Sequence, residues 1–148
     1  MPTRELVDPA PPGAQWRASA RRALLTEADG LQQLIAALDG PLGDGLAKSV
    51  QLIRSAKGRV VMTGMGKSGH IARKIAATLA STGTPASFVH PAEASHGDLG
   101  MITPDDVVIM ISNSGESPEL SEILTYTRRT AAPLAAITSV PGGTLGKE

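Results

Sequence analysis

The sequence predicts an α/β fold, a three-layer αβα sandwich built on a parallel sheet. From residue 59 onward, short aliphatic runs alternate with segments of helical pattern, as in a chain that repeats strand, helix and strand. The aliphatic runs are uniformly apolar, which is typical of parallel strands that helices cover on both faces. These two observations together favour a doubly wound arrangement.

The first part of the chain predicts a tail and two helices. Residues 1–14 are rich in proline and lack an apolar segment, so we expect a disordered tail. Apolar residues at helical spacing then predict one helix over 16–38, which Gly40 and Pro41 end, and a second helix over 42–57. We expect one domain over 15–148, formed by these helices (15–57) and an α/β core (58–148).

The core elements follow in order along the chain. Strands are expected over 60–63, 86–89, 107–111 and 134–137, and helices over 68–82 and from 118 to about 129. In the first of these helices, Ile71, Ile75 and Leu79 should face the sheet. Residues 141–148 have the pattern of a turn and the start of a further helix, so the chain is expected to be truncated at its C-terminus.

Composition excludes several classes of function. Lys plus Arg and Asp plus Glu number 14 each, and Trp, Tyr and Phe occur once each, so we expect neither a basic field nor an aromatic platform for nucleic acid. Cysteine is absent, which excludes disulfides and thiolate metal sites and fits the cytoplasm. No run approaches membrane-spanning length, so a membrane partner is not expected either.

A glycine-rich turn follows the first strand. Glycines at 64, 66 and 69 allow a sharp turn that brings N–H groups at a helix start close to an anion. Their order matches the dinucleotide pattern G-x-G-x-x-G, but no carboxylate ends the second strand. A P-loop would need glycine where Val61 stands, so that pattern fails. The turn could also serve only the packing of helix on strand.

A second motif follows the third strand. Residues 112–117 read Ser-Asn-Ser-Gly-Glu-Ser and precede a helix that begins with Pro118. Three hydroxyls, a glycine and free N–H groups at a helix start can bind a phosphate. Ordinary capping by Ser114 or Ser117 is the alternative, although capping needs only one such residue. Since ligands in open α/β sheets bind at the carboxyl ends of strands, Ser68 could approach the same site.

Three further residues are candidates for acid–base chemistry. His96 could carry protons, Glu119 could act as a general base, and Lys67 could neutralise substrate charge. Each also has an ordinary interpretation: a surface histidine, a carboxylate that complements a helix dipole, and a solvated lysine. For His70 and His90 we favour the ordinary interpretation.

These motifs together resemble those of the sugar isomerase (SIS) domain family, in particular its bacterial D-arabinose 5-phosphate isomerases. The resemblance spans residues 58–139 and rests on four segments, which are 64–70, 81–85, 90–100 and 112–117. It implies a flavodoxin-like αβα sandwich and a longer chain than this one, in many members with regulatory CBS modules. The family is usually tetrameric, so a homotetramer is implied as well.

The resemblance implies an aldose–ketose isomerase that interconverts D-arabinose 5-phosphate and D-ribulose 5-phosphate through an enediol, for synthesis of the lipopolysaccharide sugar Kdo. It implies no metal and no other cofactor. Lys67, His96 and Glu119 match positions implicated in ring opening and proton transfer. The implied phosphate-binding residues are Gly66, Ser68, Ser112, Asn113, Ser114 and Ser117. The alternative is a non-catalytic phosphosugar-binding SIS module, although no basic recognition helix of a regulator precedes residue 58.

Overall fold

The computed structural model describes residues 13–94 and 96–148. The tail expected over 1–14 lies outside the described residues except for Gly13, which precedes the first helix, and Ala14, which begins it. The chain divides into two units, one ending at Leu46 and one covering Ala47–Glu148. The single domain expected over 15–148 stays a prediction.

The N-terminal unit holds α1 (Ala14–Ala37) and the start of α2 (Pro41–Ser55), close to the predicted bounds. None of the residues of α1 is buried. Its apolar stripe is exposed along the whole helix, and the side chain at its beginning, Trp16, is 72 % exposed. The other large apolar residues exposed on α1 are Leu24, Leu25, Leu31, Leu34 and Ile35.

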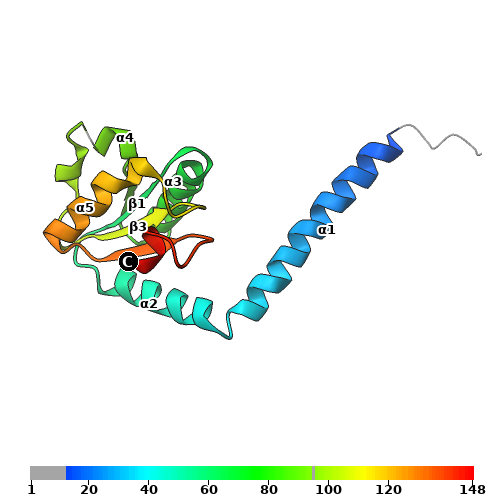
Figure 1. Cartoon of the computed structure of the whole chain (residues 1–148), viewed down its shortest axis with the longest axis horizontal. Coiled ribbons are helices and arrows are strands. Elements are labelled where there is room, and N and C mark those ends of the chain that lie inside the picture. The colour runs from blue at the N-terminus through cyan, green and yellow to red at the C-terminus, as the bar shows by residue number, and fades with distance from the viewer. Residues whose placement is uncertain (1–12, 95) are drawn as a thin grey trace, which may run out of the picture. The chain divides into compact units, whose positions relative to one another are not determined.

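A parallel sheet of four strands forms the centre of the second unit, as the apolar runs predicted (Figure 1). The strands are β1 (Val60–Gly64), β2 (Ala86–Phe88), β3 (Val107–Ile111) and β4 (Leu134–Ile137), in the order β2-β1-β3-β4. From β1 the chain moves outward to β2 and then crosses to the other side of β1 to form β3. A topological switch point therefore lies between β1 and β3.

Helices cover both faces of this sheet, which confirms the three-layer sandwich. In Figure 1, α3 (Gly66–Ser81) and α5 (Ser121–Thr130) lie on opposite faces. The core on the α3 face also receives Leu52 and Ile53 from the end of α2. The core on the α5 face includes Leu145. The short elements are α4 (Pro91–Ala94), η1 (Asp98–Met101), η2 (Pro118–Leu120) and η3 (Leu145–Lys147).

Helix α3 meets the sheet through small residues. Its buried positions are Gly69, Ala72 and Ala76. A Cβ atom on Gly69 would lie 2.5 Å from the carbonyl oxygen of Gly64, so helix and strand are in close contact there. Ile75 and Leu79 pack against the core as predicted, but the prediction for Ile71 is wrong, because its side chain is 52 % exposed. The small face of the helix is turned to β1, and this rotation leaves Ile71 outside.

A buried carboxylate fastens the amino ends of β1 and β3. Asp106, which is 3 % exposed, accepts hydrogen bonds from the Arg59 N–H (2.8 Å), the Thr103 N–H (2.8 Å) and the Thr103 hydroxyl (3.0 Å). Burial raises the pKa of Asp106, but the hydrogen bonds from Arg59 and Thr103 and the charge of Arg59 outweigh it, so this pKa lies below its usual value. The motif residues lie at the opposite ends of the same strands.

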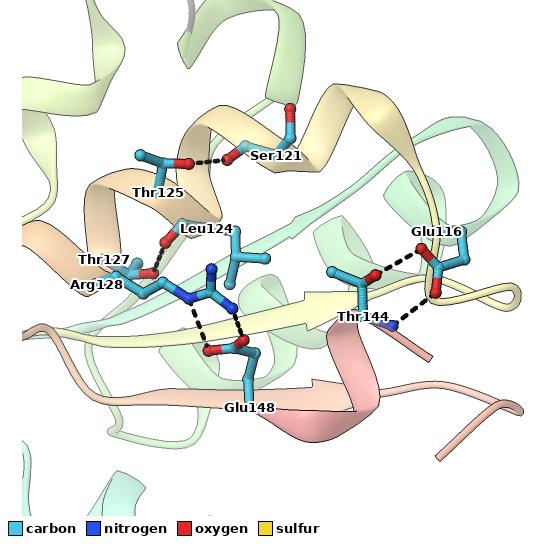
Figure 2. Close-up of polar contacts among 8 residues, drawn as sticks. All are labelled: Glu116, Ser121, Leu124, Thr125, Thr127, Arg128, Thr144 and Glu148. Atoms are coloured by element: carbon cyan, nitrogen blue, oxygen red, sulfur yellow. Dashed lines mark hydrogen bonds and ion pairs between the residues drawn. The ribbon is translucent and has the colours of Figure 1, made fainter. Parts of the chain in front are cut away.

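The C-terminal residues pack onto α5. Leu145 is buried in η3, at the place where the sequence predicts the start of a helix. Arg128 and Glu148 form an ion pair, which Figure 2 shows beside α5. Tyr126, also on α5, donates its hydroxyl to the carbonyl oxygen of Ile102 over 3.2 Å. Every helix in the described part of the chain is either too short or too polar to span a lipid bilayer.

Candidate active site

The two predicted motifs meet at one edge of the sheet. Gly64, the last residue of β1, is paired with Ile111, the last residue of β3. Residues 65–68 and 112–117 follow these paired ends directly. Because the two strands are parallel and central, both loops leave the sheet at the switch point, where open α/β sheets bind their ligands.

The glycine turn combines packing with an uncapped helix start. Gly64 and Gly69 are in close contact, so for these two residues the packing interpretation holds. Gly66 has a φ of +55°, a conformation that glycine adopts without strain. The residue before α3, Met65, makes no side-chain hydrogen bond to the helix start. The N–H groups of the first turn therefore have no side-chain cap and can serve an anion.

We call residues 112–117 the serine loop, and its hydroxyls bond mainly to one another and to the loop backbone. Ser112 is 3 % exposed, and its Oγ lies 2.6 Å from the Oγ of Ser117. The same Ser112 oxygen accepts the Gly115 N–H over 3.2 Å, and the Ser114 Oγ accepts the Glu116 N–H over 3.3 Å. Ser117 precedes η2 without capping it. Ordinary capping therefore does not explain Ser117.

The segment after β4 holds the serine loop from the other side. The Asn113 carbonyl oxygen accepts the N–H and the hydroxyl of Ser139, over 3.2 and 2.6 Å. The Glu116 carboxylate accepts the N–H and the hydroxyl of Thr144, over 2.6 and 2.7 Å (Figure 2). The pKa of Glu116 lies below its usual value. The main cause is the hydrogen bond from the Thr144 N–H, followed by that from the Thr144 hydroxyl and by the charge of Lys147.

Sequence reasoning gave no role to Glu116, although it lies inside the serine loop. One feature of the sequence could have indicated a role for Glu116. A carboxylate is unexpected in a loop that is predicted to bind a phosphate, because like charges repel. Its partner Thr144 is far away in sequence, and no local pattern indicates it.

The acid–base candidates lie around this edge without touching one another. Lys67, in the first turn of α3, and Glu119, in η2, are both exposed. His96 is exposed after α4, and its backbone N–H donates to the Glu93 carbonyl oxygen over 2.9 Å. Within residues 13–94 and 96–148, no hydrogen bond or ion pair joins these three side chains. Their joint action stays a prediction.

Two hollows lie near α5, and neither is lined by Lys67, Ser68 or His96. One, of about 140 Å³, is bounded by residues 115–118 of the serine loop and η2 and by Thr144 and Leu145. The other, of about 250 Å³, lies between Leu99 and the exposed side of α5. Of the predicted site residues, Ser117 therefore lines the smaller hollow, whereas Lys67, Ser68 and His96 line neither of the two.

The fold is that of a doubly wound α/β protein whose glycine turn and serine loop meet at the switch point of the sheet. Residues 52–148 match the SIS domain family. The chain therefore belongs to the SIS domain family, as the motifs predicted.

Curated relatives extend well beyond this chain. The Arabinose 5-phosphate isomerase KdsD of Pseudomonas aeruginosa is 51 % identical over 129 residues, which are 87 % of this chain and 38 % of the relative. The protein of the same name from Yersinia pestis is 48 % identical over 136 residues, 92 % of this chain and 40 % of the relative. The chain thus spans about two fifths of the length of these relatives.

Solved structures share the fold. The E. coli CFT073 protein c3406, solved in complex with arabinose 5-phosphate, has a TM-score of 0.74 and 42 % identity, over 87 % of this chain and 69 % of that one. The phosphoheptose isomerase GmhA of Neisseria gonorrhoeae has a TM-score of 0.69 at 17 % identity, over 86 % of this chain and 79 % of that one. The second likeness shows the fold alone.

Proposed function

We propose that this protein is an aldose–ketose isomerase that interconverts D-arabinose 5-phosphate and D-ribulose 5-phosphate through an enediol. The observation that carries the proposal is the pairing of Gly64 with Ile111, which sets the glycine turn beside the serine loop. Support comes from relatives named arabinose 5-phosphate isomerases, 46 to 51 % identical over most of this chain, and from a similar structure solved with arabinose 5-phosphate.

In this proposal the phosphate group binds between the two loops. Because the two loops follow paired strand ends, their hydroxyl and N–H groups could bind one dianion without a metal. The buried Ser112 is held in place at the bottom of the proposed site, because its hydroxyl oxygen is hydrogen-bonded to the Ser117 hydroxyl and the Gly115 N–H. The proposed binding residues are Gly66, Ser68, Ser112, Asn113, Ser114 and Ser117.

The reaction itself moves one proton between two neighbouring carbons. After the sugar ring opens, a base removes the proton from C2 and an enediol forms. A proton is then returned to C1, the C2 hydroxyl becomes the carbonyl, and the C1 carbonyl becomes a hydroxyl. We assign the base to Glu119, and ring opening and stabilisation of the developing oxyanion to His96 and Lys67.

A direct assay tests this assignment. The 148-residue chain is incubated with D-arabinose 5-phosphate, and NMR follows the formation of D-ribulose 5-phosphate. Glu119→Gln should lower turnover at least about a hundredfold, because a general base is lost. Glu122→Gln, a neighbouring carboxylate with no proposed role, is the matched control and should retain activity. Folded chain that binds the sugar phosphate without converting it would be a phosphosugar-binding module instead.

We also propose that the protein acts in the cytoplasm as a homo-oligomer, a tetramer as in its family, and supplies a precursor of Kdo. The exposed apolar stripe of α1 supports self-association. Charge supports an antiparallel pairing of two α1 helices, because Arg17, Arg21 and Arg22 lie in the first half of the helix. Glu27 and Asp29 lie in the second half.

Sedimentation analysis tests the assembly. Leu34→Glu places a charge on the apolar stripe and should lower the assembly state. Ala36→Glu, on the other side of α1, is the matched control and should not. A wild-type chain that sediments as a monomer at all concentrations would refute the homo-oligomer.

A further inference from the structure

The serine loop contains one charged side chain. Its charge is negative, which is unfavourable in a site that binds phosphate. Glu116 lies between Ser114 and Ser117, the residues proposed to bind a dianion. A free carboxylate there would repel the ligand. In the structure this carboxylate is directed at Thr144, which supplies two hydrogen-bond donors to it (Figure 2).

We call the contacts between residues 113–116 and residues 139–145 the clasp. The clasp has three points: Ser139 on the Asn113 carbonyl, the Leu145 N–H on the Gly115 carbonyl (3.1 Å), and Thr144 on Glu116. Only the last point uses a side chain of the serine loop. Its removal therefore loosens the clasp without removing any proposed phosphate ligand.

The space around Glu116 is also closely fitted. A Cβ atom added to Gly143 would lie 3.0 Å from the Glu116 Oε1 atom and 3.2 Å from the Val140 carbonyl oxygen. The backbone of the segment after β4 thus comes close to the carboxylate, and a larger residue at 143 would push it away. The Glu116 side chain is exposed, so this contact joins the serine loop and the segment after β4 at the protein surface.

We propose that Glu116 is a positioning residue, which fastens the serine loop to the segment after β4 and so holds its hydroxyls and N–H groups ready for the substrate phosphate. This proposal rests on the proposed isomerase function. Glu116 touches no reacting atom. It acts through Ser112, Ser114 and Ser117, so its loss should weaken phosphate binding and leave the chemical step largely unchanged.

The first test needs no ligand. Hydrogen exchange is measured in the free chain for the amides of Gly115 and Leu145, two residues of the clasp. Glu116→Ala should speed their exchange, whereas Glu116→Gln, which keeps an acceptor for the Thr144 N–H, should stay close to the wild type. Unchanged exchange in Glu116→Ala would overturn the proposal, because the side chain would then not order the loop.

The second test measures affinity and turnover on folded protein. Glu116→Ala should weaken binding of inorganic phosphate and of D-arabinose 5-phosphate about threefold to tenfold, and raise KM by a similar factor with kcat nearly constant. Gly143→Ala should give the same pattern from the other side of the clasp. A purely structural role would lower the melting temperature and leave these affinities unchanged, which would overturn the proposal.

The two proposals can fail separately. Should the wild-type chain bind neither ligand, the isomerase function fails, and the exchange rates still decide whether Glu116 orders the loop. Should the wild type turn over substrate while Glu116→Ala keeps its KM and loses kcat, positioning is refuted and Glu116 belongs to the chemical step.

Discussion

Replacement of Asp106 by asparagine should destabilise the α/β unit strongly, although the residue lies at the end of the sheet away from the candidate site. The carboxylate is 3 % exposed and accepts three hydrogen bonds. Asparagine can keep one acceptor oxygen for the Arg59 N–H, but its amide group then meets the Thr103 N–H as a second donor. Each hydrogen bond to a charged group contributes about 1.5–3 kcal/mol, so the loss of the two Thr103 bonds should cost about 3 kcal/mol at neutral pH.

The stabilisation by the Asp106 carboxylate should decrease as the pH is lowered. The folded pKa of Asp106 lies below the value of the unfolded chain, about 3.9. Its carboxylate therefore contributes stability that is fully present above that value and is lost as the pH falls through the folded pKa. The difference between wild type and Asp106→Asn should be full at about pH 7 and shrink below about pH 4, where the protonated acid resembles the amide.

Urea unfolding followed by circular dichroism measures both quantities. Asp105→Asn is the matched control, because Asp105 is exposed and no described hydrogen bond uses its carboxylate. A difference below about 1 kcal/mol at neutral pH would refute the reasoning. The same conclusion would follow if the difference did not change with pH, or if Asp105→Asn cost as much.

Two other substitutions test the packing and the ligand site. Gly69→Ala would place a Cβ atom 2.5 Å from the Gly64 carbonyl oxygen, so α3 must move and about 2–3 kcal/mol of stability should be lost on thermal unfolding. Gly100→Ala, with open space around it, should cost little, and an equal loss would refute the close-contact explanation. Ser112→Ala should raise the Kd for D-arabinose 5-phosphate about tenfold in calorimetry, since it removes a buried donor; an unchanged Kd would exclude Ser112 from the site.

The sequence predicts the sheet well because its strands are buried on both faces. The bounds of β3 and β4 agree with the prediction at both ends, and those of β1 and β2 differ by one residue. A strand between two helical layers must be apolar throughout, and this signal is local in sequence. The order of strands and helices then follows from the repeated pattern and the short connections.

The errors and omissions concern contacts between distant residues. Hydrophobicity alone favoured Ile71 as an inward residue, but the close contact of Gly64 with Gly69 sets the rotation of α3. The hydrogen bond between Glu116 and Thr144 joins residues 28 positions apart, and no periodic sequence pattern predicts such a pair. The residues proposed for proton transfer can be recognised in the sequence only as parts of motifs. Their positions relative to one another depend on the tertiary fold, which no local pattern predicts.

The aromatic residues give each unit its own optical reporter. Trp16, the single tryptophan, belongs to α1, and Tyr126, the single tyrosine, belongs to the α/β unit, where its hydroxyl bonds to Ile102. Tryptophan emission should therefore respond to whatever covers the apolar stripe of α1. Tyrosine emission should respond to the loss of contact between α5 and the Ile102 backbone. Spectroscopy of the unmodified chain can thus distinguish association of the helix from melting of the sandwich.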